Sequence, residues 1–100
     1  MKAKVVASPS RVFDKHETLS TTQLKIAELS PNGGRLGFMI YSEKTNTSDI
    51  YVRYKTGVSA TAKSYAISPG ELWVDPINWQ GEYYVVAASG APVIDYSEFL

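Results

Sequence analysis

The sequence predicts an all-β protein, an antiparallel β-sandwich that is jelly-roll-like and has about seven or eight short strands. Three observations support this prediction. Apolar and polar residues alternate with the period of two of a half-buried strand, most clearly over residues 50–55. Clusters of Gly, Pro, Asn and Ser recur between short apolar runs, as is typical of sandwiches and barrels. No segment carries a helical repeat.

The first twenty residues are expected to form an N-terminal arm or edge strands, and residues 21–100 the β-sandwich domain. Candidate edge strands lie at Lys2–Ala7 and at Val12–Phe13. The polar stretch His16–Thr22, rich in Ser and Thr, is typical of a mobile connector.

The first strands of the sandwich follow from their patterning. Residues 21–28 alternate, with Leu24 and Ile26 as the inward pair, and end at the turn signal of residues 30–34. Residues 36–41 are apolar on both faces, which suits a central strand. A polar loop over residues 42–49 separates them from the alternating strand at 50–55. These two strands are therefore predicted to form an antiparallel hairpin.

The later strands are shorter and are separated by clear turns. Residues 65–67 are followed by Ser68-Pro69-Gly70-Glu71, where proline presets one φ angle and glycine supplies a positive one. Residues 72–75 form the next strand, which Pro76 ends. After the loop at 77–81, residues 82–88 form another strand that is apolar on both faces, and residues 93–99 close the chain.

Composition excludes several classes of function. Ten Lys and Arg balance ten Asp and Glu, so there is no basic excess to hold a nucleic acid. The chain has no cysteine and one histidine, so neither a thiolate site nor a multi-histidine metal centre can form within one chain. No apolar run approaches the ~18 residues of a membrane span. We therefore expect no cofactor, no metal, no nucleic-acid partner and no membrane partner.

Enzyme chemistry has few candidate residues. His16 is the one histidine that could act as a base, and its charged surroundings favour a solvated loop residue. Paired carboxylates stay an alternative, because cross-strand pairing could join two of a set of five. That set is Glu71, Asp75, Glu82, Asp95 and Glu98. No catalytic residue is assigned, and the chain is not expected to be an enzyme.

Aromatic side chains are the richest resource for binding, since the chain has seven Tyr, two Trp and three Phe. Tyr and Trp favour interfaces because one end is apolar and the other can hydrogen-bond. Trp79 lies in a polar loop, and Trp73 alternates away from Leu72 and Val74, so at least one is expected near the surface. The predicted interface candidates are Tyr51, Arg53, Trp73, Trp79 and Tyr83.

The order of motifs from Arg35 onward resembles a known group. An apolar strand and a polar loop lead to Asp49-Ile50-Tyr51-Val52, a small-residue segment at 57–62 and the Ser-Pro-Gly-Glu turn. The run from Trp79 to Gly90, Trp-Gln-Gly-Glu-Tyr-Tyr-Val-Val-Ala-Ala-Ser-Gly, precedes a closing acidic strand. Over residues 21–99 this resembles small tailed-bacteriophage virion accessory proteins, the capsid decoration or cement proteins and other head-associated types.

The resemblance implies a non-enzymatic virion structural protein, made in the host cytoplasm, that binds the major capsid protein or other virion subunits and stabilises the capsid. It also implies a homo-oligomer, with a trimer as the candidate form. It brings no catalytic residues. The alternative function is a carbohydrate- or receptor-binding β-module of a phage fibre or tail, in which surface Trp and Tyr side chains stack on sugars.

Overall fold

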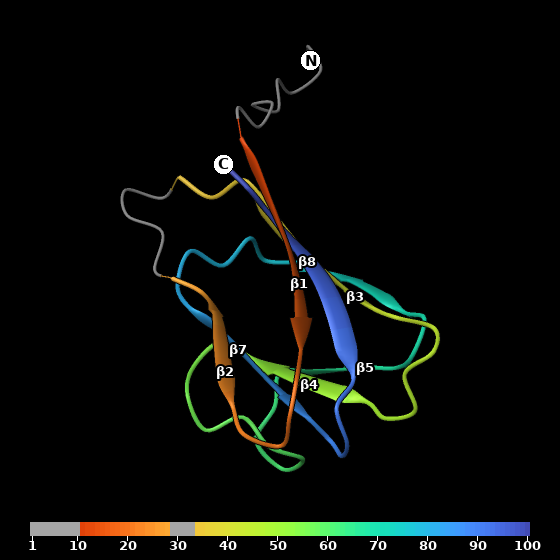
Figure 1. Cartoon of the computed structure of the whole chain (residues 1–100). Coiled ribbons are helices and arrows are strands. Elements are labelled where there is room, and N and C mark those ends of the chain that lie inside the picture. Colours follow the sequence, from red (N-terminus) through yellow and green to blue (C-terminus); the bar gives the residue numbers. More distant parts are fainter. Residues whose placement is uncertain (1–10, 29–33) are drawn as a thin grey trace.

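The computed structural model describes residues 11–28 and 34–100 of the chain (Figure 1). All regular elements in these two ranges are strands. They are β1 (Val12–Thr18), β2 (Leu24–Ala27), β3 (Gly37–Ser42), β4 (Ile50–Arg53), β5 (Tyr65–Ile67), β6 (Leu72–Val74), β7 (Tyr83–Ala87) and β8 (Val93–Phe99). Over the same ranges, no helix has the length and hydrophobicity to cross a membrane.

The strands form two four-stranded antiparallel sheets. Sheet A has the order β1-β8-β3-β6, and sheet B has the order β2-β7-β4-β5. The first strand pairs with the last, the second with the seventh, the third with the sixth and the fourth with the fifth. The chain is therefore one long hairpin folded over on itself, which is the topology of a jelly roll. The predicted fold class is confirmed.

The core fills the space between the sheets and is rich in aromatic rings. Phe38 of β3 stacks on Tyr83 of β7 with ring centroids 4.1 Å apart, which joins the two sheets directly. Such rings bury large apolar areas and so dominate the stability of a small core. The other fully or almost fully buried core residues include Ile40, Ile50, Val52, Ile67, Val85 and Ile94.

The predicted hairpin between residues 36–41 and 50–55 is wrong. β3 pairs with β6 and β8 in sheet A, whereas β4 pairs with β5 and β7 in sheet B. The connecting loop is held to β8 instead, because the Asn46 side chain donates to the Val93 carbonyl (2.7 Å) and accepts from the Val93 amide (2.8 Å). Alternation of residues identified both strands but could not identify their partners.

The N-terminal region is more regular than expected. Residues 12–18 form β1, an edge strand that pairs with β8 along its whole length, so the mobile connector predicted at His16–Thr22 is wrong for residues 16–18. The candidate strand Lys2–Ala7 lies outside the described residues. In β2, Ile26 is buried as predicted, but Leu24 is 37% exposed.

The outer faces of the two sheets differ. A covering segment, residues 55–64, packs Val58 against Tyr84 and Val86 on the outer face of sheet B. Gln23 fixes this segment, since its Oε1 accepts hydrogen bonds from the amides of Gly57 (2.6 Å) and Val58 (3.1 Å). β7 is consequently buried on both faces, as its apolar composition predicted.

Arg35 is a charged residue at the end of the core, with 1% of its surface exposed. Its guanidinium forms an ion pair with Glu98 of β8 at 2.8 Å. It also donates to the carbonyls of Glu28 (2.6 Å), Trp79 (3.0 Å) and Gly81 (2.8 Å), and lies over the Tyr83 ring. Through these contacts Arg35 joins the residue that follows β2, strand β8 and the loop before β7.

We expect Arg35→Met to lower the free energy of unfolding by about 3 kcal/mol, because it leaves a mostly buried carboxylate without its partner. Urea unfolding followed by tryptophan fluorescence measures the loss. Arg53→Met is the matched control, since among the described residues the half-buried Arg53 side chain donates only to the nearby carbonyls of Thr56 and Gly57, in solvent-exposed hydrogen bonds. Its effect should stay within about 1 kcal/mol. Equal losses in the two variants would contradict the role assigned to Arg35.

Candidate binding surfaces

Two of the five predicted interface residues lie in the core. Tyr83 is 0% exposed and Trp73 is 9% exposed, so neither can present its ring to a partner. In β6 the inward residue is Trp73, whereas Leu72 and Val74 point outward, each 54% exposed. The sequence-based assignment had these faces reversed, because a three-residue strand that is apolar throughout shows no alternation to choose between them.

Trp79 is partly exposed, as expected, and forms one wall of a shallow hollow. Its ring lies so close to Gly81 that a Cβ there would be 2.5 Å from the indole, so this position requires glycine. Its Nε1 donates to the Glu82 carbonyl at 3.0 Å. The hollow is lined by Tyr54, Lys55, Thr56, Trp79, Gly81, Glu82 and Tyr84. An aromatic face beside polar groups is chemically suited to stacking on a sugar ring.

Asp75 holds the loop that carries Trp79. Its carboxylate accepts hydrogen bonds from the amides of Ile77 (3.1 Å) and Trp79 (2.8 Å) and from the hydroxyls of Tyr54 (2.8 Å) and Tyr83. Burial alone would raise the pKa of Asp75, but these donors outweigh it and keep the pKa below its usual value. This carboxylate is thus a structural hydrogen-bond acceptor.

Tyr51 and Arg53 lie on the outer face of sheet B and are half-buried. Tyr51 packs against the cluster of Val58, Tyr84 and Val86, and the Lys63 ammonium lies 5.1 Å from the centre of its ring. The covering segment therefore already occupies much of the surface that these residues were expected to offer to a partner.

An apolar patch that the sequence pattern does not predict lies on the outer face of sheet A. The register places Met39 opposite Val74 and Tyr41 opposite Leu72. All four side chains point outward, and we call them the β3–β6 patch. Leu72 and Val74 are each 54% exposed, and Met39 and Tyr41 are half-buried. Neighbouring apolar groups of this kind on an outer face mark interaction sites more often than isolated ones do.

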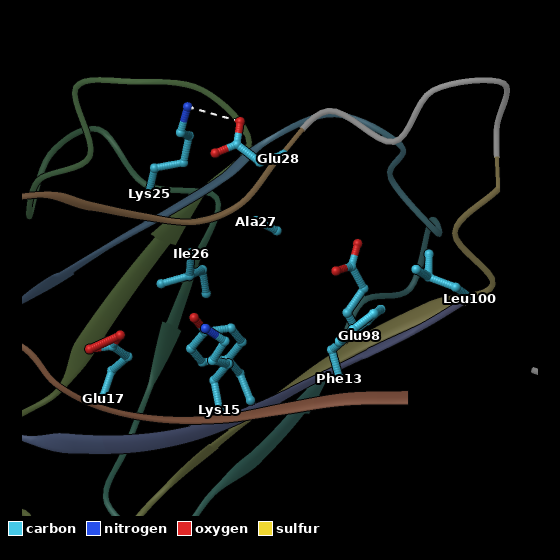
Figure 2. A pocket seen from close by; sticks show the side chains of 10 residues that line it. Phe13, Lys15, Glu17, Lys25, Ile26, Ala27, Glu28, Glu98 and Leu100 are labelled. Atoms are coloured by element: carbon cyan, nitrogen blue, oxygen red, sulfur yellow. Dashed lines mark ion pairs between the residues drawn. The ribbon is translucent and has the colours of Figure 1, made fainter. Parts of the chain in front are cut away.

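A cleft of about 500 Å³ opens along the side of the sandwich between the edge strands β1 and β2 (Figure 2). Phe13, Lys15 and Glu17 of β1 point into it from one wall, and Ile26 and Ala27 of β2 lie on the other. Its volume is within the range of small-molecule sites, but it is a side opening with charged residues on both walls. The remaining lining residues are Lys25, Glu28, Tyr96, Glu98 and Leu100.

On the outer face of sheet A, His16 lies close to two carboxylates, Asp95 of β8 and Glu43, which directly follows β3. Its Nδ1 lies 2.6 Å from Asp95 Oδ1 and 3.6 Å from Glu43 Oε2. The hydrogen bond to Asp95 raises the pKa of His16, and the same bond lowers the pKa of Asp95. The nearby Asp95 carboxyl raises the pKa of Glu43. One imidazole nitrogen and two carboxylate oxygens within 4.8 Å of one another form a donor set able to hold a divalent cation.

The sequence did not identify this cluster. His16 is exposed as expected, but it lies in a strand, and its partner Asp95 is 79 residues away. The five carboxylates considered as possible pairs do not gather: Glu71 accepts from the Ser68 amide, Asp75 binds the two tyrosines, Glu82 binds Lys25, and Glu98 binds Arg35. Only the strand register could have placed Glu43 beside Asp95.

No family model, curated protein or solved structure matches the chain. The class of protein is therefore defined by the fold alone, a jelly roll in which the described residues form eight strands and leave the outer face of sheet A uncovered.

We expect the pKa of His16 to lie above 6.5 and to fall in Asp95→Asn, with a smaller fall in Glu43→Gln. Because the folded-state pKa exceeds the unfolded value, protonated His16 stabilises the fold below about pH 6.5, and this contribution disappears as the pH rises through the folded-state pKa. An NMR titration of the imidazole resonances measures it, and the assignment is unambiguous because the chain has one histidine. A wild-type pKa at or below 6.5 would refute the pairing.

Proposed function

We propose that the chain is a non-enzymatic structural protein of a tailed-bacteriophage virion, which binds the assembled capsid as a decoration or cement protein and acts as an oligomer. The motif order over residues 21–99 supports the phage assignment. The jelly roll supports it as well, since viral capsid proteins use this architecture, although other functions share it. Its partner is the major capsid protein or another virion subunit.

The observation that carries the proposal is the β3–β6 patch. Leu72 and Val74 project from the edge strand of sheet A, and Met39 and Tyr41 extend the apolar area inward along the sheet. Apolar side chains at the centre of a contact, with polar groups around them, are the usual anatomy of a protein interface. On the same face, Asp95, Ser97 and Asp14 supply the polar margin.

A protein that binds only the assembled shell stabilises that shell by its own binding free energy. Each contact can be weak, because a capsid repeats the site many times and an oligomer engages several sites together. A small rigid patch is sufficient for this mechanism. It requires no catalytic group, and the patch residues supply none.

The test is co-sedimentation of the purified chain with expanded capsid shells that lack it. We expect the double variant Leu72→Glu/Val74→Glu to bind about tenfold or more weakly, which corresponds to at least about 1.4 kcal/mol. Both side chains are exposed, so the fold should be retained, and circular dichroism checks this.

Ala66→Glu is the matched control, since it places a carboxylate on an exposed position of β5, the edge strand of the other sheet. It should bind like the wild type. Shell binding that is absent in the wild type, or unchanged in the double variant, would contradict the proposal.

A carbohydrate- or receptor-binding module of a phage fibre or tail is the second candidate, and the hollow beside Trp79 favours it. Tyr54 and Trp79 supply ring faces, and Glu82 and Lys55 supply polar contacts. This function predicts selective binding on a glycan array that is lost in Trp79→Ala and kept in Leu72→Glu/Val74→Glu. The capsid function predicts the reverse dependence in co-sedimentation, so the two assays separate the candidates.

A further inference from the structure

The exposed edge of β1 is the longest free strand edge among the described residues. β1 is an outer strand of sheet A, seven residues long, and six of the seven are exposed. Such an edge presents unpaired N–H and C=O groups that can pair with another strand. We propose that β1 pairs antiparallel with β1 of a second copy across a two-fold axis, which joins the two copies of sheet A into one eight-stranded sheet.

The hydrogen-bond pattern of β1 leaves the correct groups free. Arg11 and Leu100 exchange both of their backbone hydrogen bonds, and the amide of Leu19 bonds the Pro92 carbonyl. In an antiparallel pair such bonds fall on alternate residues, so the odd-numbered residues of β1 bond to β8. The N–H and C=O groups of the even-numbered residues therefore point away from the sheet. These residues are Val12, Asp14, His16 and Thr18.

Charge selects one register for the pair. If the two-fold axis passes beside His16, Lys15 lies opposite the partner's Glu17, and Glu17 lies opposite the partner's Lys15. Opposite charges at facing positions stabilise an antiparallel pair, and like charges destabilise it. Shifting the axis to Lys15 would instead place two lysines opposite each other. The self-complementary register is therefore the one centred on His16.

Inward-pointing charges on an edge strand can also serve to prevent pairing. A row of lysines would repel a second copy in every register. β1 instead carries Lys15 and Glu17, two residues apart on the same face. A two-fold axis beside the residue between them places each of these side chains opposite its counterion in the second copy, which gives two ion pairs. Neither the Lys15 nor the Glu17 side chain takes part in an ion pair among the described residues.

Pairing also covers the cleft between β1 and β2. Phe13, Lys15 and Glu17 point into this cleft from β1, so a second copy beside β1 would close its open side with the same three side chains (Figure 2). On the outer face, the two His16 side chains would face each other. Each keeps its own Asp95 and Glu43 as neighbours, so four carboxylates surround the pair.

Analytical ultracentrifugation over a range of concentrations tests the proposal. The wild type should be a dimer, and Lys15→Glu or Glu17→Lys should each weaken it about tenfold, because each creates two like-charged pairs. The double variant Lys15→Glu/Glu17→Lys should regain the wild-type dimer, since it restores both ion pairs with reversed signs. Lys55→Glu, with the same change of charge outside β1, should have no effect. A monomeric wild type, or a double variant no tighter than the singles, would overturn the proposal.

A cysteine crosslink tests the register independently, because the chain has no cysteine of its own. Facing residues of a hydrogen-bonded antiparallel pair have Cα atoms about 5.5 Å apart, a separation that a disulfide spans. Oxidation should therefore crosslink His16→Cys to a covalent dimer, and should leave Lys55→Cys largely without a covalent crosslink. Crosslinking of Lys15→Cys in preference to His16→Cys would contradict the register.

Both experiments use the free chain, so they can fail while the capsid proposal stands. The contact closes as a dimer, and not as the trimer expected from the resemblance.

Discussion

The buried guanidinium of Arg35 holds the two sheets together at one end of the sandwich. Its ion pair with Glu98 belongs to sheet A, while its bond to the Glu28 carbonyl reaches the end of β2 in sheet B. Glu28 and Glu98 also stand on opposite walls of the cleft between β1 and β2, so Arg35 sets the spacing of these walls. The buried guanidinium is stable because its N–H groups all donate hydrogen bonds to oxygen atoms and its flat face packs on the Tyr83 ring.

The two sheets are unequal, and this inequality determines where a partner can bind. Sheet B covers its own outer face with residues 55–64, which Gln23 holds in place. Sheet A has no such cover in the described residues, and its outer face carries the β3–β6 patch at one edge and the His16 cluster at the other. The free edge of β1 lies beside that cluster. The candidate contacts with a capsid and with a second copy therefore use opposite edges of sheet A and can exist together.

Much of the fold could be predicted from the sequence, because strands and turns are local signals. The strands predicted at 65–67 and 93–99 coincide with β5 and β8, and proline and glycine mark the turn at Ser68–Glu71. The partners of the strands could not be predicted, since Asn46 fixes the path between β3 and β4 through contacts with Val93, 47 residues away. The same limit applies to the binding surfaces. No local pattern marks Arg35 as a buried cation, and the outward face of β6 is predicted wrongly because no alternation distinguishes Trp73 from its neighbours.

We propose that the chain binds the capsid through the outer face of sheet A. Hydroxyl-radical footprinting of the chain, free and bound to expanded capsid shells, measures this contact, because it reports the solvent exposure of individual side chains. We expect protection of Met39, Tyr41 and Leu72 on binding, with Tyr51 unchanged. Protection confined to Trp79 and the residues around its hollow, or an unchanged pattern over sheet A in the bound chain, would contradict the claim.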